Sequence, residues 1–260
     1  MTKIQIQGYS LSCQIPSSGT DTCILFLHGL QSRKEIFEDI RQALSNCFTI
    51  PHLAIDFIGF GHSDKPENFS YDLAGQQHIV LELLRKLDIK NVHIIGHSRG
   101  GMLGTLMIKD VPNVVRSLVS LEGNLCLEDC GESRKVAALP FDEFKNTYYP
   151  ALKEKLAQST EPSAQFRYQS LLLIPDYAFY KTSKATVAWS KKGQLKDIFQ
   201  SSPHPKLMVY GQNSHFHSRP TGKSVSLAEI PESGHFMMLD NPDATLDVIQ
   251  DFLTRLLHNP

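Results

Sequence analysis

Ser98 lies in the segment GHSRG, residues 96–100, which has the residue types of a tight turn that exposes a serine hydroxyl. A short apolar run typical of a strand precedes the segment, and a helical pattern follows it. In so sharp a turn the residues two before and two after the serine must have almost no side chain, and Gly96 and Gly100 meet that condition. The serine then has a strained backbone at a helix N-terminus, where N–H groups face developing negative charge. The pattern predicts that Ser98 is a nucleophile.

The same three residues, Gly-His-Ser, also occur at 61–63, but there no glycine comes two residues after the serine. This second copy follows the apolar run that ends near Asp56, and we interpret it as a structural loop near the site. The overlapping segment 59–64 lacks the third glycine of a dinucleotide-binding loop, so the sequence predicts no nucleotide cofactor.

Apolar runs alternate with segments of helical period along most of the chain. Runs typical of strands lie at 3–14 (two strands), 23–29, 48–57, 92–96, 115–123, 206–211 and 224–230. Helical patterns lie at 34–44, 72–89, 99–111 and 242–257, the last with Asn241 as N-cap and Pro242 at its first position. This alternation predicts an α/β protein with a parallel sheet and helices on both faces.

Three further motifs occur elsewhere in the chain, next to expected strands or near the C-terminus. They are His28-Gly29 after the third expected strand, DxxGxGxS from Asp56 to Ser63, and Gly234-His235 near the end. With these motifs the chain resembles the α/β-hydrolase fold family. The resemblance implies an eight-stranded, mostly parallel sheet with helices on both faces.

The strand-helix alternation stops after Gly123. Residues 124–205 look helical and loop-rich, and they contain five of the eight tyrosines and the single tryptophan, Trp189. The resemblance implies that this segment is a cap, or lid, over the carboxyl ends of the strands, and that 1–123 and 206–260 form the core domain. We interpret the aromatic side chains of the lid as contacts for an apolar or aromatic substrate group, with packing inside the lid as the alternative.

The resemblance also assigns a base and an oxyanion hole. His235 fits the general base because it follows the last strand and precedes the final helix, and Gly234 leaves room for its ring. The backbone N–H groups of Leu30 and Arg99 would hold the oxyanion. We expect the Arg99 side chain to be in solvent, with pairing to a substrate carboxylate as the alternative. We expect His97 to pack or hydrogen-bond beside the nucleophile.

The turn after the strand 206–211, where this family usually carries its catalytic acid, holds no carboxylate: residues 212–214 read QNS. Glu122 instead ends the strand that follows the Ser98 helix, and Ser98, Glu122 and His235 follow the family's order of nucleophile, acid and base. Haloalkane dehalogenases resemble this chain in carrying their acid here, although their nucleophile is an aspartate. A glutamate is long enough to span the extra strand, so we predict Glu122 as the acid.

Other polar residues fit structural roles better. The strand order that the resemblance implies puts Asp56 on the far side of the sheet from His235. Glu232 is only three residues from His235, and Asp240 lies near a helix start, where an acid caps the helix. Cys126 and Cys130 have no second cysteine pair or nearby histidine, and His215 and His217 lack a third partner. We therefore predict ordinary thiols, solvated loop histidines and no metal site.

Composition limits the class of protein. The chain has 260 residues, 41% hydrophobic and 20% charged, with a formal net charge of −1, and so has no electrostatic footprint for nucleic acid. Its five cysteines, an odd number at irregular spacings, favour a reducing compartment. The N-terminus lacks the apolar region of a secretory signal, and no apolar run approaches the ~20 residues of a membrane span. These observations predict a cytoplasmic protein that acts on a small molecule.

Together, these residues predict a serine hydrolase that cleaves a small ester, thioester or lactone through an acyl-enzyme on Ser98, with no cofactor. The same fold also hosts carbon–carbon bond hydrolases and cofactor-free perhydrolases, and the residues favour none of the three. A non-catalytic ligand-binding homologue is the alternative outside enzymes. The intact set of serine, histidine and acid argues against that alternative, because a binding protein has no need of a strained turn.

Overall fold

A single eight-stranded sheet forms the centre of the protein. The structure is a computed structural model that describes residues 2–16 and 19–258. The strands are β1 Thr2–Ile6, β2 Tyr9–Gln14, β3 Thr22–Leu27, β4 His52–Ile55, β5 Asn91–His97, β6 Val115–Leu121, β7 Lys206–Gly211 and β8 Val225–Ile230. Their order in the sheet is β1-β2-β4-β3-β5-β6-β7-β8. Strand β2 is antiparallel to both neighbours, and β3 to β8 are parallel, which confirms the predicted fold class.

The strand expected at 48–57 is the one that the structure shortens most, to β4 His52–Ile55. Pro51 has no N–H to donate to the ladder, although its carbonyl accepts a hydrogen bond from Ile24 at 2.9 Å. After Ile55 the chain leaves the sheet, because Asp56 turns to Lys34 and their side chains form a buried ion pair at 2.8 Å. The polar end of the predicted run therefore belongs to a loop.

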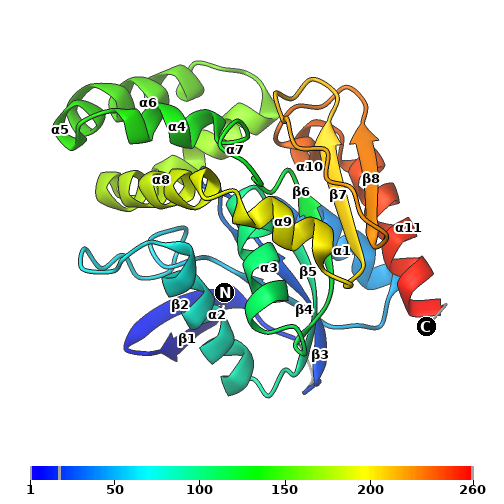
Figure 1. Ribbon diagram of the computed structural model, residues 1–260. Coiled ribbons are helices and arrows are strands. Elements are labelled where there is room, and N and C mark those ends of the chain that lie inside the picture. The colour runs from blue at the N-terminus through cyan, green and yellow to red at the C-terminus, as the bar shows by residue number, and fades with distance from the viewer. Residues whose placement is uncertain (1, 17–18, 259–260) are drawn as a thin grey trace.

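Helices cover both faces of the sheet (Figure 1). On one face lie η1 Lys34–Phe37, α1 Glu38–Cys47, α10 Met237–Asp240 and α11 Pro242–His258. On the other lie α2 Leu73–Lys86, α3 Arg99–Asp110 and α9 Gln194–Ser201. Each layer encloses its own apolar cluster against the sheet. The predicted cap of α11 is present, because Oδ1 of Asn241 accepts the N–H of Ala244 at 3.3 Å.

Between β6 and β7 the chain builds a second, helical layer above the carboxyl ends of the strands (Figure 1). Its elements are α4 Gly131–Ala138, α5 Phe141–Glu143, the π-helical turn η2 Phe144–Tyr148, α6 Tyr149–Ala157, α7 Pro162–Leu171 and α8 Asp176–Lys191. Helix α9 follows them and contacts α3, so the last part of the segment 124–205 packs with the core helices.

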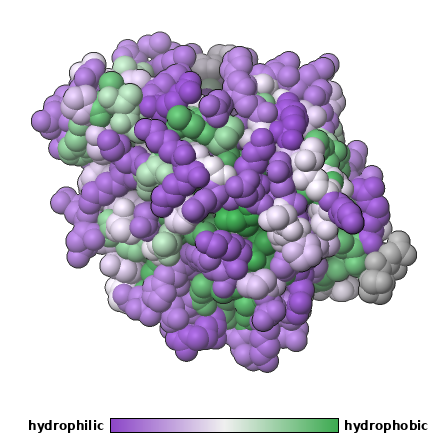
Figure 2. Space-filling view, viewed as in Figure 1, coloured by the Kyte–Doolittle hydropathy of each residue, from purple (hydrophilic) through white to green (hydrophobic). Residues whose placement is uncertain are grey.

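Aromatic side chains hold this helical layer together. The ring of Phe144 lies within 5.8 Å of those of Tyr149 and Phe179, and the Tyr149 hydroxyl donates to the carbonyl of Ile174 at 2.8 Å. Over the helical layer, Figure 2 shows mainly hydrophilic side chains, with smaller hydrophobic patches between them. Within residues 2–16 and 19–258, none of the helices combines the length and the apolar character needed to cross a bilayer.

Candidate active site

Ser98 sits at the sharp turn between β5 and α3. Its backbone has φ +52° and ψ −115°, a conformation that costs free energy for a residue with a Cβ. Its N–H donates to the carbonyl of Leu121 at 2.8 Å, which ties the turn to the end of β6. A Cβ at Gly96 would lie 2.5 Å from the backbone of Gly100, and one at Gly100 would overlap the carbonyl of Leu27. The two glycines are therefore required by the close approach of backbone on each side of the serine.

Glu122 is the first residue after β6 and is 1% exposed. Its N–H donates to the carbonyl of Val209 at 2.9 Å, and its backbone has φ +49°. One carboxylate oxygen, Oε1, accepts the N–H of Gly211 at 2.9 Å, and the other, Oε2, lies 2.5 Å from Nδ1 of His235. Both oxygens are thus held by donors, which fixes the carboxylate toward the imidazole.

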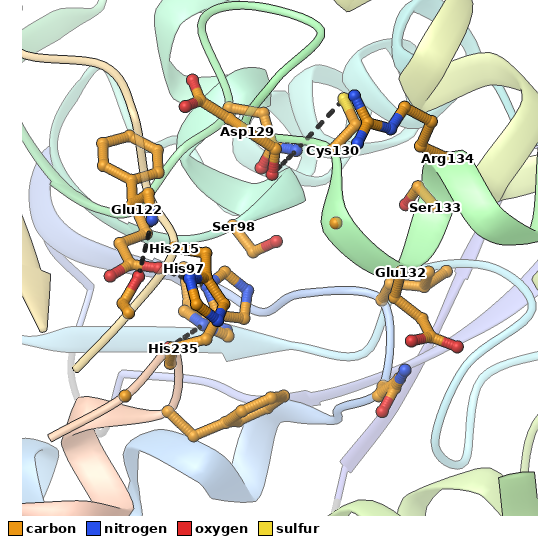
Figure 3. A pocket seen from close by; sticks show the side chains of 18 of the residues that line it. His97, Ser98, Glu122, Asp129, Cys130, Glu132, Ser133, Arg134, His215 and His235 are labelled. Carbon is orange, nitrogen blue, oxygen red and sulfur yellow. Dashed lines mark hydrogen bonds and ion pairs between the residues drawn. The ribbon is translucent and has the colours of Figure 1, made fainter.

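His235 lies in the loop after β8 and faces the same pocket as Ser98 and Glu122 (Figure 3). Because Nδ1–H donates to Glu122, the other ring nitrogen, Nε2, is left free to accept a proton. The loop is held by two further contacts: the N–H of Gly234 donates to Asp240 at 2.9 Å, and the carbonyl of His235 lies 2.9 Å from Nε2 of His97. Asp240 therefore caps this loop rather than the final helix.

The sequence led us to expect that His97 packs or hydrogen-bonds beside Ser98, and in the structure its ring packs against that of His235. Its ring centroid is 4.7 Å from that of His235, and its side chain is buried. Burial, reinforced by the neighbouring His235, holds the pKa of His97 well below its usual value, so the ring is neutral. A neutral His97 donates from Nε2 to the carbonyl of His235 without adding positive charge beside the His235 ring.

The segment that leads to Leu30 is held by a buried histidine. Nδ1 of His28 donates to the carbonyl of Gly29 at 2.8 Å, and Nε2 accepts the N–H of Phe57 at 3.0 Å. Burial lowers the pKa of His28 to about 4, so the ring is neutral and both hydrogen bonds persist at neutral pH. Leu30 follows and lines the pocket beside Ser98.

The side chain of Arg99 is not in solvent, so that expectation is wrong. It is 2% exposed, and its Nη2 donates to the carbonyls of Tyr71 at 2.8 Å and Asp72 at 3.0 Å. Burial lowers the pKa of Arg99 to about 10. The guanidinium therefore anchors the segment at the start of α2 and does not line the pocket that contains Ser98. Its backbone N–H is at the first position of α3, where helices have no internal acceptor.

The other acids considered from the sequence lie elsewhere. Asp56 pairs with Lys34 and also accepts the N–H of His62 at 3.0 Å, so it holds the second Gly-His-Ser loop. Ser63 of that loop donates to the carbonyl of Asp56 at 2.7 Å, which agrees with a structural role. Glu232 is exposed, with φ +52°. Of these acids and Glu122, the structure brings only Glu122 to the imidazole.

The three side chains open into a pocket of about 640 Å³ (Figure 3). Helices α4 and α7 line it from the helical layer, and residues 213–217 line it from the β7–β8 loop. Among the described residues, Phe216 and Phe236 are the aromatic side chains on the pocket wall, apart from histidines. The tyrosines of 124–205 and Trp189 do not line the pocket. Around Phe144, the rings of Tyr149 and Phe179 pack inside the helical layer, as the alternative interpretation predicts.

Asp129 was not singled out from the sequence. Its Oδ1 accepts the N–H groups of His217 and Ser218, both at 3.0 Å, and its Oδ2 accepts those of Leu125 and Cys126 at 3.0 and 3.2 Å. It thereby joins the start of the helical layer to the β7–β8 loop. An aspartate in a polar turn predicts local backbone hydrogen bonds, but not a bond to a loop 88 residues away.

The cysteines and loop histidines do not form a metal site. Cys126 and Cys130 are free thiols, and His215 and His217 are exposed at the pocket rim. Across residues 2–16 and 19–258, no three histidine, cysteine, aspartate or glutamate side chains converge in a way that could hold a metal ion.

Residues 22–242 match the family described as the alpha/beta hydrolase fold. The chain belongs to this family. Among the curated proteins similar to this hydrolase-fold chain is the 2-(acetamidomethylene)succinate hydrolase of Mesorhizobium japonicum, which is 24% identical over 94% of this chain and 92% of that protein.

Solved structures of the alpha/beta hydrolase fold are also similar to this chain. An esterase from Exiguobacterium antarcticum superposes with a TM-score of 0.79 at 18% identity, covering 97% of this chain and 99% of that one. A structure from a study of carboxylesterases of Nitrososphaera gargenis gives 0.84 at 15% identity, with 100% of both chains covered. At identities this low, the superpositions show a common fold and no more than that.

Proposed function

We propose that this alpha/beta hydrolase is a serine hydrolase that cleaves a small ester, thioester or lactone. The observation that carries the proposal is the hydrogen bond of 2.5 Å between Glu122 and His235 beside the strained Ser98 turn. A serine hydroxyl is a weak nucleophile at neutral pH, and an oriented imidazole is the group that activates it. The esterase similarity in fold is consistent with this chemistry.

In the proposed reaction, Oγ of Ser98 attacks the carbonyl carbon while Nε2 of His235 takes its proton. The carbonyl electrons move to oxygen, and the backbone N–H groups of Leu30 and Arg99 hold the oxyanion. His235 then returns the proton to the leaving alcohol, thiol or lactone oxygen, and Ser98 keeps the acyl group. A water molecule then attacks the acyl carbon while His235 takes its proton. His235 passes this proton to Oγ of Ser98, the bond between Ser98 and the acyl group breaks, and the acid is released. Glu122 keeps the imidazole in the right tautomer and stabilises its charged form.

Helices α4 to α8 act as the cap in this proposal, because they lie above the carboxyl ends of the strands and supply part of the pocket wall (Figure 1). A cap that excludes water strengthens the electrostatic interactions of the catalytic groups. It also restricts the substrate to molecules that fit a pocket of about 640 Å³.

The direct test is turnover of a panel of p-nitrophenyl esters and lactones by the wild-type protein and by Ser98→Ala. We expect Ser98→Ala to lose at least about 10³-fold in kcat, and to lose labelling by a fluorophosphonate probe while its circular dichroism is unchanged. A wild-type protein that neither turns over any member of the panel nor reacts with the probe would contradict the proposal and favour a ligand-binding role.

A further inference from the structure

Arg167 of α7 lines the same pocket as Ser98 and His235. Its Nε donates to Oε1 of Gln31 at 2.7 Å, and its guanidinium carbon lies 5.1 Å from the centroid of the Phe236 ring. Gln31 directly follows Leu30 of the proposed oxyanion hole, and Phe236 directly follows the proposed base. The guanidinium is therefore fixed by chain neighbours of two groups that act on the substrate.

The outer nitrogens of this guanidinium have no protein partner. Within the part of the chain that the structure describes, Nη1 and Nη2 of Arg167 make no hydrogen bond, and no carboxylate lies within 4.0 Å of the group. Burial lowers the pKa of Arg167, and the more distant Glu132 and Asp240 oppose that shift. An arginine stays charged at neutral pH, and a partly buried charge without a counterion costs free energy.

The other charged groups that line the pocket are held by hydrogen bonds or lie in solvent, and Lys135 and Glu128 are among the exposed ones. Asp129 accepts four backbone N–H groups, Glu132 accepts the Tyr148 hydroxyl at 2.8 Å, and Asp240 accepts the N–H of Gly234. Arg134 of α4 is exposed, so water solvates its charge. Arg167 thus differs from the other charges named here, because it presents a fork of free donors while its position is fixed by the protein.

We propose that Arg167 binds a carboxylate of the substrate, so that the preferred substrate is a small ester, thioester or lactone that carries a second, anionic group. A guanidinium fork matches the two oxygens of a carboxylate, and such pairs are the strong, oriented class of hydrogen bond. The proposal rests on the proposed hydrolase function, since it assigns specificity to that site.

The test compares esters that differ only in charge. Mono-p-nitrophenyl glutarate and p-nitrophenyl pentanoate place a carboxylate or a methyl group at the end of the same acyl chain. The pair 4-acetoxybenzoate and methyl 4-acetoxybenzoate places the charge on the leaving group instead. We expect wild-type kcat/KM to favour the anionic member of one pair, which shows on which side of the ester the carboxylate lies.

In Arg167→Gln, the ratio of kcat/KM for the anionic ester to that for its neutral partner should fall about 10- to 100-fold, mainly through KM. Arg167→Lys keeps the charge but not the fork, and should give an intermediate ratio. Arg134→Gln is the matched control, because it removes an exposed arginine from the same pocket. The ratio for Arg134→Gln should change less than about threefold, as expected for screened surface charge.

A binding experiment separates this proposal from the proposed function. Glutarate binding to Ser98→Ala, measured by calorimetry, should weaken at least about 10-fold when Arg167→Gln is added. If the wild type cleaves esters but the anionic preference is absent in both pairs, or is unchanged in Arg167→Gln, the carboxylate site is wrong and the hydrolase stands. If the wild type cleaves no ester, the hydrolase proposal fails, and equal glutarate binding with and without Arg167 would overturn the carboxylate site as well.

Discussion

Glu122 and His235 are 113 residues apart in the chain, yet Oε2 of the one lies 2.5 Å from Nδ1 of the other. The two residues follow β6 and β8, so the carboxylate reaches across the end of β7, whose Gly211 donates its N–H to the second oxygen. A Cβ at Gly211 would overlap the carbonyl of Gly234. Because Gly211 has no side chain, the loop that contains His235 lies directly against β7. The Glu122 side chain can therefore reach His235 across that one strand.

Glu122→Gln should lower kcat for ester hydrolysis by about 10²- to 10⁴-fold, because an amide no longer fixes the tautomer of His235 or stabilises its charged form. The fold should survive, since the amide oxygen of glutamine still accepts the N–H of Gly211. The measurement is steady-state kinetics on the best p-nitrophenyl ester. Glu232→Gln is the control: that side chain is exposed, and its removal should change kcat less than about twofold. Near-normal kcat in Glu122→Gln would show that another group orients the base.

Asp129→Ala should destabilise both loops that the carboxylate joins, because four backbone N–H groups lose their acceptor. We expect the free energy of unfolding in urea to fall by about 2–4 kcal/mol, and KM to rise because both loops line the pocket. Glu128→Ala removes an exposed neighbouring acid and should stay within about 0.5 kcal/mol of the wild type. Equal stability of the two variants would mean that Asp129 does not hold the loops together.

The stability of the protein should fall as pH drops from 6.5 to 4. The folded-state pKa of His28, about 4, is below the ordinary value of 6.5, so the unfolded chain binds more protons in this window. His28 contributes about 3 kcal/mol to the free energy of unfolding above pH 6.5, and this contribution is lost as the pH falls from 6.5 to 4. Burial lowers the pKa of His52 to about 4 and holds that of His97 well below its usual value, so both histidines act in the same direction.

His28→Gln tests this origin of the pH dependence. Glutamine keeps a donor and an acceptor but does not titrate. The slope of unfolding free energy against pH between pH 6.5 and 4 should therefore decrease by an amount that corresponds to at most about one bound proton. The measurement is urea unfolding at several pH values. His78→Gln, which replaces an exposed histidine on α2, should keep the wild-type slope. An unaltered slope in His28→Gln would rule out His28 as a source.

Gly100→Ala should destabilise the turn around Ser98, because the added methyl group overlaps the carbonyl of Leu27, which is backbone and has little room to move. We expect a loss of about 1–3 kcal/mol in unfolding free energy, together with lower kcat as Ser98 shifts. Gly131→Ala is the matched control, since its Cβ would meet nothing within 4 Å. A Gly100→Ala protein with wild-type melting temperature and kcat would contradict the tight turn.

Local sequence determined much of the architecture. Period-two and period-3.6 patterns placed the strands and helices of the core, because side-chain burial repeats with the geometry of each element. The strained turn at Ser98 was also readable, since it depends on Gly96 and Gly100 only a few residues away. Asn241 was identified as a helix cap for the same reason, because a cap is completed within four residues.

Tertiary structure decided which distant groups meet. The sequence placed Glu122 at a strand tip, but only the packing of β7 between β6 and β8 sets its distance to His235. The same holds for Arg99, whose buried guanidinium finds the carbonyls of Tyr71 and Asp72, and for Arg167, whose partner Gln31 is 136 residues away. Whether an arginine is solvated, buried or aimed into a pocket depends on contacts between segments, and neither residue type nor local period encodes those contacts.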